Sequence, residues 1–594
     1  MKRIYPVLPA LLFICFAHAD VDLVKNGKPL ADIVVETNAL SSVKLAADDV
    51  QEYIEKMSGA KLPITNAPSE KFKNHVYVGP SEYVKKLGIK TDDLKPEGFK
   101  IIAKDNYIVL IGRDEQRKPF PHAHHGEGLT NWWKFAGEKY NVPFYIPFNS
   151  KVGVYPYDAT ATFYAASELL EQLGVRWYNP YENGTVIPEK KSIAVPEQTL
   201  GKAPVFPIRQ FAYYAQHCDA DALKWFKRLK YGSSYLYGGA HATHTIIGHP
   251  EQKTEHPEYF AEVNGKRIGS IKYGVPRFCN ENFRKSSINF LNKTFEAYPY
   301  LVAFDLMPTD GLGQIDERDA KIWSRPERGY GSKYSDYLWD YWLWAAKELK
   351  KTNPDKYLVC WSYTPYKDPP SGIDKLPDNV AMYLCQNTAT LMMPNSKHTL
   401  DVRAKFLSML TSKKMFMYDY YLFYRTEQRP RYPVFFTKFL QEDMQSLAGI
   451  CEGKNIEIAS ELTKQGHRIT CPGLTHMLHY WQGKLYWNPD MDRQKMLDEY
   501  YELYFGPAKK EMKEFYEFAE EVWIRPESRD QGRGKKREKS MDSRDPYTDK
   551  RFRYARSHKS LSLGHQCLPH PNGRRKSGMF RHFTDRQDVV RRLV

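Results

Sequence analysis

The sequence predicts an α/β protein made of an N-terminal α/β domain, a (β/α)8 barrel of the TIM type and C-terminal helices. Three observations support this prediction. The chain has 594 residues, which is too long for one ordinary domain. Residues 20–204 contain two amphipathic helical patterns and several short strand patterns. Residues 205–489 alternate short apolar runs with longer helical segments, which is the pattern of repeated strand–helix units.

The N-terminal domain begins with a regular helical pattern whose apolar face contains residues 43, 46, 47, 50, 53, 54 and 57. Ser41 or Ser42 can cap its start, and Gly59 can end it. Residues 75–79 form a short strand, and residues 99–112 form a hairpin. A second amphipathic helix follows within 157–178. This order of elements predicts a compact α/β domain over residues 20–204.

An insertion at residues 113–155 is rich in proline, histidine and aromatic residues. His122, His124 and His125 are a conceivable metal-binding group. No acidic or cysteine partner stands at a recognised spacing from them. The insertion is therefore interpreted as a polar loop near a cleft, and no metal or other cofactor is predicted.

The barrel region, residues 205–489, contains the strand candidates 207–214, 233–239, 300–308, 356–363, 380–386, 414–421 and 448–453. Helical segments such as YSDYLWDYWLWAAKELKK lie between several of them. A doubly wound sheet would alternate in the same way. The absence of GxGxxG and GxxxxGK[ST] motifs from this region removes the usual reason to prefer that fold.

The C-terminal part changes character twice. Residues 490–524 carry two helical patterns that we expect to pack on the end of the barrel. Residues 525–594 contain 20 Lys and Arg against 8 Asp and Glu and have no sustained apolar period. This tail is either disordered and basic or translated out of the correct frame, and the abrupt end of the helical pattern favours the frame error. The rest of the chain has a net charge of only +4 out of the total of +16, which argues against a nucleic-acid partner.

The N-terminus reads MKRIYPVLPALLFICFAHA, with a basic start, a short apolar run and a small-residue site. This pattern predicts a signal peptide, residues 1–19, that is cleaved after Ala19. The predicted location is therefore secreted or periplasmic. No later run is long and apolar enough for an integral membrane segment. The eight cysteines include no CxxC pair, so neither a zinc ribbon nor a small disulfide scaffold is indicated.

Five stretches carry a resemblance to a known family: AADDVQEYIEKMSGAKLPI, YAASELLEQLGVRWYNPYENGTVIPEKKSIAVP, HPEYFAEVNGKR, MPTDGLG, and LYWNPDMD with YYELYFGPA. They resemble bacterial secreted proteins of domain of unknown function 4838. The N-terminal part is similar to the non-catalytic domain that precedes family 20 hexosaminidase and family 67 α-glucuronidase barrels. The resemblance implies a carbohydrate-active barrel. The Asp-Glu pair of family 20 is replaced by Asp310-Gly311, so ordinary hexosaminidase chemistry is not implied.

Glycoside hydrolysis uses two carboxyl groups, one that protonates the leaving oxygen and one that acts as nucleophile or activates water. In a barrel these groups project from the carboxyl ends of strands. Asp310, Asp419 and Glu452 meet this condition in the sequence and are the candidate catalytic residues. Each has a structural alternative: a turn for Asp310, a backbone hydrogen bond for Asp419 and a pair with Lys454 for Glu452. Asp305 is assigned to a structural contact within its strand.

Six further residues are candidates for substrate binding. By the resemblance, Arg209 at the first strand would hold sugar hydroxyls. His241 and His244 follow the second strand and could bind hydroxyls or transfer protons. Trp361, Tyr363 and Trp481 could stack on sugar faces, although core packing is the alternative for each.

We therefore expect a secreted glycoside hydrolase that acts on a polysaccharide or glycan fragment. A carbohydrate-binding barrel without catalysis is the alternative. A serine hydrolase is disfavoured because the sequence lacks a GxSxG motif. The sequence predicts no oligomeric state.

Overall fold

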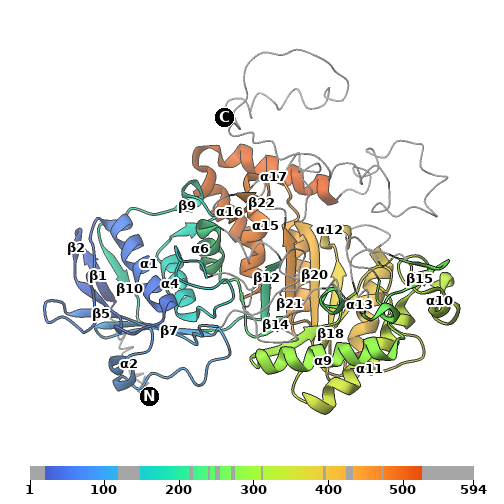
Figure 1. The fold of residues 1–594 in the computed structure, drawn as a ribbon. Coiled ribbons are helices and arrows are strands. Elements are labelled where there is room, and N and C mark those ends of the chain that lie inside the picture. Colours follow the sequence, from blue (N-terminus) through green and yellow to red (C-terminus); the bar gives the residue numbers. More distant parts are fainter. Residues whose placement is uncertain are drawn as a thin grey trace, which may run out of the picture.

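The computed structural model describes residues 20–117, 148–212, 219–238, 241–247, 255–268, 275–308, 312, 314–391, 396–422, 433–458, 460–463, 466–469 and 472–524. An N-terminal α/β domain lies beside a curled parallel sheet, and the C-terminal helices contact both parts (Figure 1). The predicted signal peptide, the three histidines of the insertion, Asp310 and the tail after residue 524 lie outside the described residues.

The N-terminal domain contains a six-stranded sheet in the order β11-β6-β7-β5-β3-β4 and a three-stranded sheet in the order β10-β1-β2. The bounds of its strands are β1 (Val21–Lys25), β2 (Lys28–Pro29), β3 (Ala31–Val34), β4 (Ile64–Thr65), β5 (Asn74–Val78), β6 (Phe99–Lys104), β7 (Tyr107–Gly112), β10 (Ile193–Val195) and β11 (Gln198–Lys202). A small pair, β8 (Arg176–Trp177) and β9 (Thr185–Val186), lies between α4 and β10 in the sequence.

The helices of this domain are α1 (Ser41–Ser58), α2 (Glu82–Lys86) and α4 (Ala161–Gln172). α1 packs against α4, and α4 packs on β6 and β7. The predicted helix 43–57 and hairpin 99–112 are therefore present. Gly59 ends α1 in the left-handed conformation, with φ of 78°. The predicted serine cap is wrong, because the cap position is Leu40 and no side chain caps the helix.

Seven parallel strands form the barrel sheet in the order β12-β21-β20-β19-β18-β17-β14. Their bounds are β12 (Ile208–Ala212), β14 (Leu236–Gly238), β17 (Leu301–Asp305), β18 (Tyr357–Ser362), β19 (Val380–Gln386), β20 (Met415–Leu422) and β21 (Gly453–Ile458). The short β13 (Gly232–Ser233) pairs antiparallel with β12 and leads into β14. The barrel-type fold is confirmed, with seven parallel strands among the described residues where eight were predicted.

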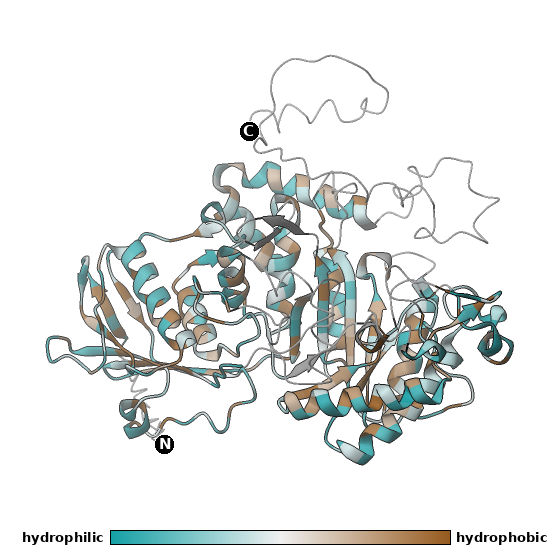
Figure 2. Cartoon of the chain, viewed as in Figure 1, coloured by the Kyte–Doolittle hydropathy of each residue, from teal (hydrophilic) through white to brown (hydrophobic). Residues whose placement is uncertain are grey.

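Helices cover the outside of this sheet, and their outward sides carry many of the hydrophilic residues (Figure 2). Their bounds are α6 (Ala220–Arg228), α7 (Thr243–Ile247), α9 (Glu281–Ala297), α10 (Glu317–Trp323), α11 (Ser335–Thr352), α12 (Thr388–Leu391), α13 (Lys397–Met409), α14 (Thr437–Leu447) and α15 (Pro472–Leu485). Two hairpins complete this part: β15 (Glu262–Val263) with β16 (Lys266–Arg267), and β22 (Ser460–Thr463) with β23 (Gly466–Ile469).

The two faces of the barrel strands are distinguished by their contacts. Phe304 of β17 packs on Phe290 of α9, so it faces the helices. Successive residues of a strand face opposite sides, so Asp305 faces the barrel interior. It is joined there by Trp361, whose ring stacks on Tyr383 with centroids 4.5 Å apart. Residues in register on neighbouring strands face the same side, so Tyr383 and Phe416 also face the interior.

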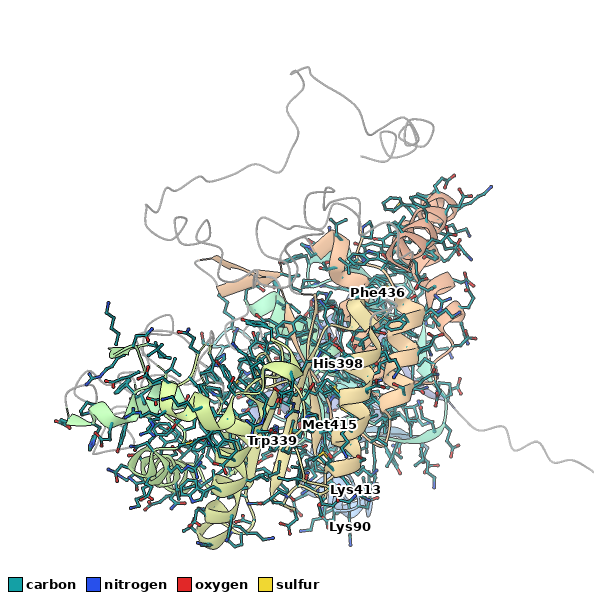
Figure 3. The ribbon with its side chains drawn as sticks, turned by 90° about the vertical axis from the view of Figure 1, so that its right-hand side faces the viewer. Lys90, Trp339, His398, Lys413, Met415 and Phe436 are labelled. Carbon is teal, nitrogen blue, oxygen red and sulfur yellow. The ribbon has the colours of Figure 1, made fainter. Side chains whose placement is uncertain are left out.

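The last barrel strand differs from its predicted position. The sequence pattern placed it at 448–453, but β21 runs from Gly453 to Ile458. Residues 448–452 instead connect α14 to the strand, and Ile450 is exposed there. Lys413, just before β20, lies at the amino end of the strands, and Phe436, just before α14, lies at the opposite end (Figure 3). The shift therefore changes which residues of β21 reach the carboxyl end.

The predicted C-terminal helices are α16 (Arg493–Phe505) and α17 (Lys509–Ile524), joined by the short η6 (Gly506–Ala508). The remaining short helices are η1 (Glu182–Gly184), η2 (Pro257–Tyr259) and η3 (Pro326–Arg328). Arg176 pairs with Glu499 of α16 at 2.7 Å, while Glu520 of α17 accepts from Thr437 of α14. The C-terminal helices thus tie the N-terminal domain to the barrel. None of the helices in the described part of the chain has the length and apolar character needed to cross a bilayer.

Candidate functional site

The carboxyl ends of the barrel strands bring polar and aromatic side chains to one inner wall. From β17 to β20 this wall contains Asp305, Trp361, Tyr383 and Tyr418. Such a wall lies where barrel enzymes place their catalytic groups. It is the candidate functional site, and the residues that form it come from four strands between Leu301 and Leu422.

Asp305 ends β17 and is fully buried. Its Oδ2 accepts a hydrogen bond from Trp361 Nε1 at 3.1 Å. Its Oδ1 accepts from the backbone N–H groups of Ala242 and Met307, each at 3.3 Å. Burial raises the pKa of this carboxyl to about 6, against the opposing effect of these donors and of nearby His241. A carboxyl group with this pKa can hold a proton near neutral pH and release it to a reacting group.

His241 lies beside this carboxyl in a strained backbone conformation, with φ of 56°. Its Nδ1 is 2.6 Å from the carbonyl oxygen of Pro308. A carbonyl oxygen can only accept, so Nδ1 of His241 carries a proton and donates it in this contact. His241 thereby fixes the backbone two residues before Asp310.

Aromatic rings line the interior wall on the next strands. Trp361 of β18 stacks on Tyr383 of β19 at an interplanar angle of 21°, and Tyr418 of β20 meets both rings at an angle. Trp361 is a predicted sugar-stacking residue. It lies directly against Asp305 and, like Tyr383, is buried. Tyr363, another predicted residue, follows β18 and is half-buried at the same end.

Two strands that complete the wall add polar groups that the sequence reasoning missed. Asn455 of β21 is in register with Tyr418 of β20 and with Gln210 of β12. Glu457, two residues further along β21, is half-buried near the carboxyl end of the strand. In the segment KNIEI every second residue faces the same side of the sheet, so Asn455 and Glu457 could have been assigned to the inner side if the strand had been placed correctly.

Glu452, a predicted catalytic residue, lies at the other end of the barrel. It precedes the first residue of β21, and its Oε2 accepts from Tyr235 Oη at 2.6 Å. A carboxylate at the amino end of a strand is on the face opposite the candidate site. The strand shift explains the difference, since the prediction took Glu452 for the end of a strand.

Asp419, a second predicted catalytic residue, faces the helices. Its Oδ2 lies 3.0 Å from Lys454 Nζ, and its Oδ1 accepts from Thr388 N at 2.9 Å. Lys454 also pairs with Asp443 of α14 at 2.7 Å. Burial alone would lower the pKa of Lys454, but these two carboxylates raise it. Asp419 is therefore held in a buried ionic network outside the barrel interior.

Arg209, predicted to hold sugar hydroxyls, is also fully buried. Its Nη2 donates to Glu97 Oε2 at 2.7 Å, while Nε and Nη1 donate to backbone carbonyls of the barrel. The guanidinium thus joins the barrel to the N-terminal domain. It faces away from the inner side of the sheet, because the next residue, Gln210, is in register with the inward-facing Asn455.

Trp481 is fully buried on α15 and donates from Nε1 to the Thr437 carbonyl, so it packs between helices. His244 belongs to α7, and its side chain lies outside the described residues, as does Asp310. Within the described ranges, no group of three or more His, Cys, Asp or Glu side chains is arranged to hold a metal ion.

The model of one protein family matches residues 177–517, which is more than half of the chain. The chain belongs to the family described as domain of unknown function (DUF4838). This confirms the resemblance stated from the sequence. No curated protein matches this DUF4838 chain.

Solved structures with a similar arrangement include carbohydrate enzymes. One is a family GH115 4-O-methyl-α-glucuronidase with specificity for decorated arabinogalactans, at 12% identity and a TM-score of 0.48, covering 84% of this chain and 63% of that one. Another is a GH138 enzyme targeting pectin rhamnogalacturonan II, at 11% identity and a TM-score of 0.36, covering 83% and 56%. A Flavobacterium johnsoniae chitobiase of GH20 matches at 10% identity and a TM-score of 0.40, covering 84% and 72%. The DUF4838 chain spans less than two thirds of the first two, so its function is argued from its own site.

Proposed function

We propose that this DUF4838 protein is a glycoside hydrolase that acts on a polysaccharide or glycan fragment. The observation that carries the proposal is the contact between Asp305 and Trp361 at the carboxyl ends of β17 and β18. It places a carboxyl group with a pKa of about 6 beside an indole that stacks with Tyr383. Glycoside hydrolysis needs a carboxyl that is protonated before reaction, and aromatic faces are common sugar contacts.

Asp310 remains a proposed sugar-contacting carboxyl in this function. It follows Pro308, whose carbonyl is fixed by His241. We propose that it acts as acid, base or hydroxyl acceptor. The Asp310→Asn variant keeps the size of the side chain and removes its charge. Turnover should fall by about 100-fold or more if Asp310 takes part in acid/base catalysis, with an unchanged melting temperature.

The decisive experiment is incubation of purified protein with a panel of plant, microbial and animal glycans. Release of new reducing ends, detected chromatographically, supports hydrolysis. Saturable binding by calorimetry without any cleavage supports the alternative, a carbohydrate-binding barrel. The aromatic wall favours that alternative as a second candidate, because it needs no catalytic carboxyl.

We also propose that the protein is exported and that the signal peptide is removed after Ala19. Mass spectrometry of the exported protein should find Asp20 as its first residue. Retention of Met1 in the exported form would contradict this proposal.

A further inference from the structure

Two carboxyl groups lie on the inner side of the barrel sheet, Asp305 on β17 and Glu457 on β21. The facing of Glu457 follows from its neighbours. Lys454 Nζ pairs with Asp443 of α14, so Lys454 points toward the helices. Alternation along the strand turns Asn455 and Glu457 inward, and the register with the interior residue Tyr418 at Asn455 agrees.

The positions of the two strands set the arrangement. β18, β19 and β20 lie between β17 and β21 in the curled sheet. Asp305 is the last residue of β17, and Glu457 is the residue before the last of β21. The two carboxyls therefore lie at the same end of the curled sheet, with three strands between them.

We propose that Asp305 is the general acid and Glu457 the general base of an inverting glycoside hydrolysis in this barrel. This assignment rests on the proposed function and makes it specific. Neither residue was expected to be catalytic from the sequence. Asp305 was assigned to a structural contact. Glu457 was not considered, because the last barrel strand was predicted at 448–453 and residue 457 lies beyond it.

The surroundings of the two carboxyls differ in the way that this chemistry requires. Asp305 is fully buried against Trp361, Ala242 and Met307, so its charged form loses hydration. Glu457 is half-buried and keeps contact with solvent. Different surroundings of two carboxyls divide the acid and base roles between them in glycoside hydrolysis.

The reaction step conserves atoms and charge. The Asp305 proton passes to the glycosidic oxygen as the bond between that oxygen and the anomeric carbon breaks. A water oxygen bonds to the anomeric carbon from the opposite face and gives a proton to the Glu457 carboxylate. Inversion is favoured because three strands lie between the two carboxyls, whereas retaining enzymes hold their carboxyls close together.

The test compares variants on two leaving groups of whichever sugar the wild type cleaves. Asp305→Asn should lose about 100-fold or more on the natural glycan. It should stay within a few-fold of wild type on the 2,4-dinitrophenyl glycoside, whose leaving group needs no proton. Partial unfolding lowers both rates alike, so it cannot produce this difference. An equal loss on both substrates would show that Asp305 only supports the fold.

Glu457→Gln should lose about 100-fold or more on both substrates. Sodium azide should restore turnover of Glu457→Ala, because azide attacks the anomeric carbon without needing a base. The product should be the glycosyl azide of inverted configuration. Glu452→Gln is the matched control, since Glu452 stands at the amino end of the same strand and its hydrogen bond to Tyr235 can persist. It should retain wild-type rates.

Three results would overturn the assignment. Wild-type activity in Glu457→Gln would exclude Glu457 as the base. A product of retained configuration by proton NMR would exclude its water-activating role. Binding without cleavage by the wild type would reject the proposed hydrolysis itself. This last result is distinct from cleavage that survives both substitutions, which would reject only the residue assignment.

Discussion

The Arg209 guanidinium donates to the Glu97 carboxylate at 2.7 Å, and neither side chain has any solvent-exposed surface. Glu97 belongs to the N-terminal domain and Arg209 to the first barrel strand. Burial alone would raise the pKa of Glu97, but Arg209 and Arg117 outweigh it and lower the pKa below 4.5. The pair therefore remains charged near neutral pH and joins the two parts of the protein.

Glu97→Gln should destabilise the protein by about 3–5 kcal/mol, because it leaves the buried Arg209 charge without its partner. Chemical denaturation at pH 7 measures the change. The exposed pair Lys350–Asp378 supplies the control, and Asp378→Asn should leave the midpoint unmoved. Equal effects of the two substitutions would contradict a structural role for the Glu97–Arg209 contact.

Lys454→Met should also destabilise the protein by about 3–5 kcal/mol, since it leaves Asp419 and Asp443 buried without their cation. The double variant Lys454→Met/Asp419→Leu should recover part of this loss, because one unpaired carboxylate is removed with the lysine. Urea denaturation of the double variant and of both single variants, Lys454→Met and Asp419→Leu, tests the coupling. A double variant less stable than the sum of the single changes would argue against the network.

The sequence predicted most of the fold because its signals are local. The helix at 41–58 and the hairpin at 99–112 depend on spacing and turn residues within one segment. Six barrel strands were located for the same reason. β21 was misplaced because Lys454 is charged and its buried partner Asp419 is 35 positions away. An apolar run at AGIC therefore looked more like a strand than KNIEI did.

The candidate site was harder to predict than the fold. The sequence around Arg209 suggested a sugar ligand. The structure shows that its partner is Glu97, which is 112 residues earlier in the chain. The sequence around Asp305 suggested an ordinary strand residue. In the structure it accepts a hydrogen bond from Trp361, which is 56 residues later in the chain. These roles depend on contacts between distant segments, and a single sequence contains no local sign of them.

Asp114 gives a prediction about the pH dependence of stability. It is half-buried in the N-terminal domain, where Thr162 N donates to its Oδ1 at 3.1 Å. Burial raises its pKa from 3.8 to about 7, although the hydrogen bonds from Thr162 and Ser42 oppose the shift. The folded state therefore binds this proton more tightly than the unfolded state.

The stabilisation from this proton is fully present below pH 3.8 and is lost as the pH rises through about 7. Asp114→Asn should remove this component, so the free energy of unfolding of the variant should rise relative to that of wild type between about pH 4 and 7, by up to about 4 kcal/mol. Denaturation midpoints measured across this range test the prediction. Parallel pH curves for the two proteins would show that Asp114 does not titrate there.

The last prediction concerns the hydrogen bond from Trp361 to Asp305, and it needs no substrate. The raised pKa means that Asp305 is protonated well below pH 6 and ionised well above it. An indole N–H donates more strongly to a carboxylate than to a neutral carboxyl group. The Trp361 Nε1 proton should therefore move downfield in the NMR spectrum as the pH rises, with a midpoint near 6. Trp361→Phe identifies the signal by removing it, and Asp305→Asn should leave the signal in place but abolish its titration. A Trp361 signal that does not move between pH 4 and 8 would mean that Asp305 keeps one protonation state throughout, and it would remove the proton that the proposed acid must donate.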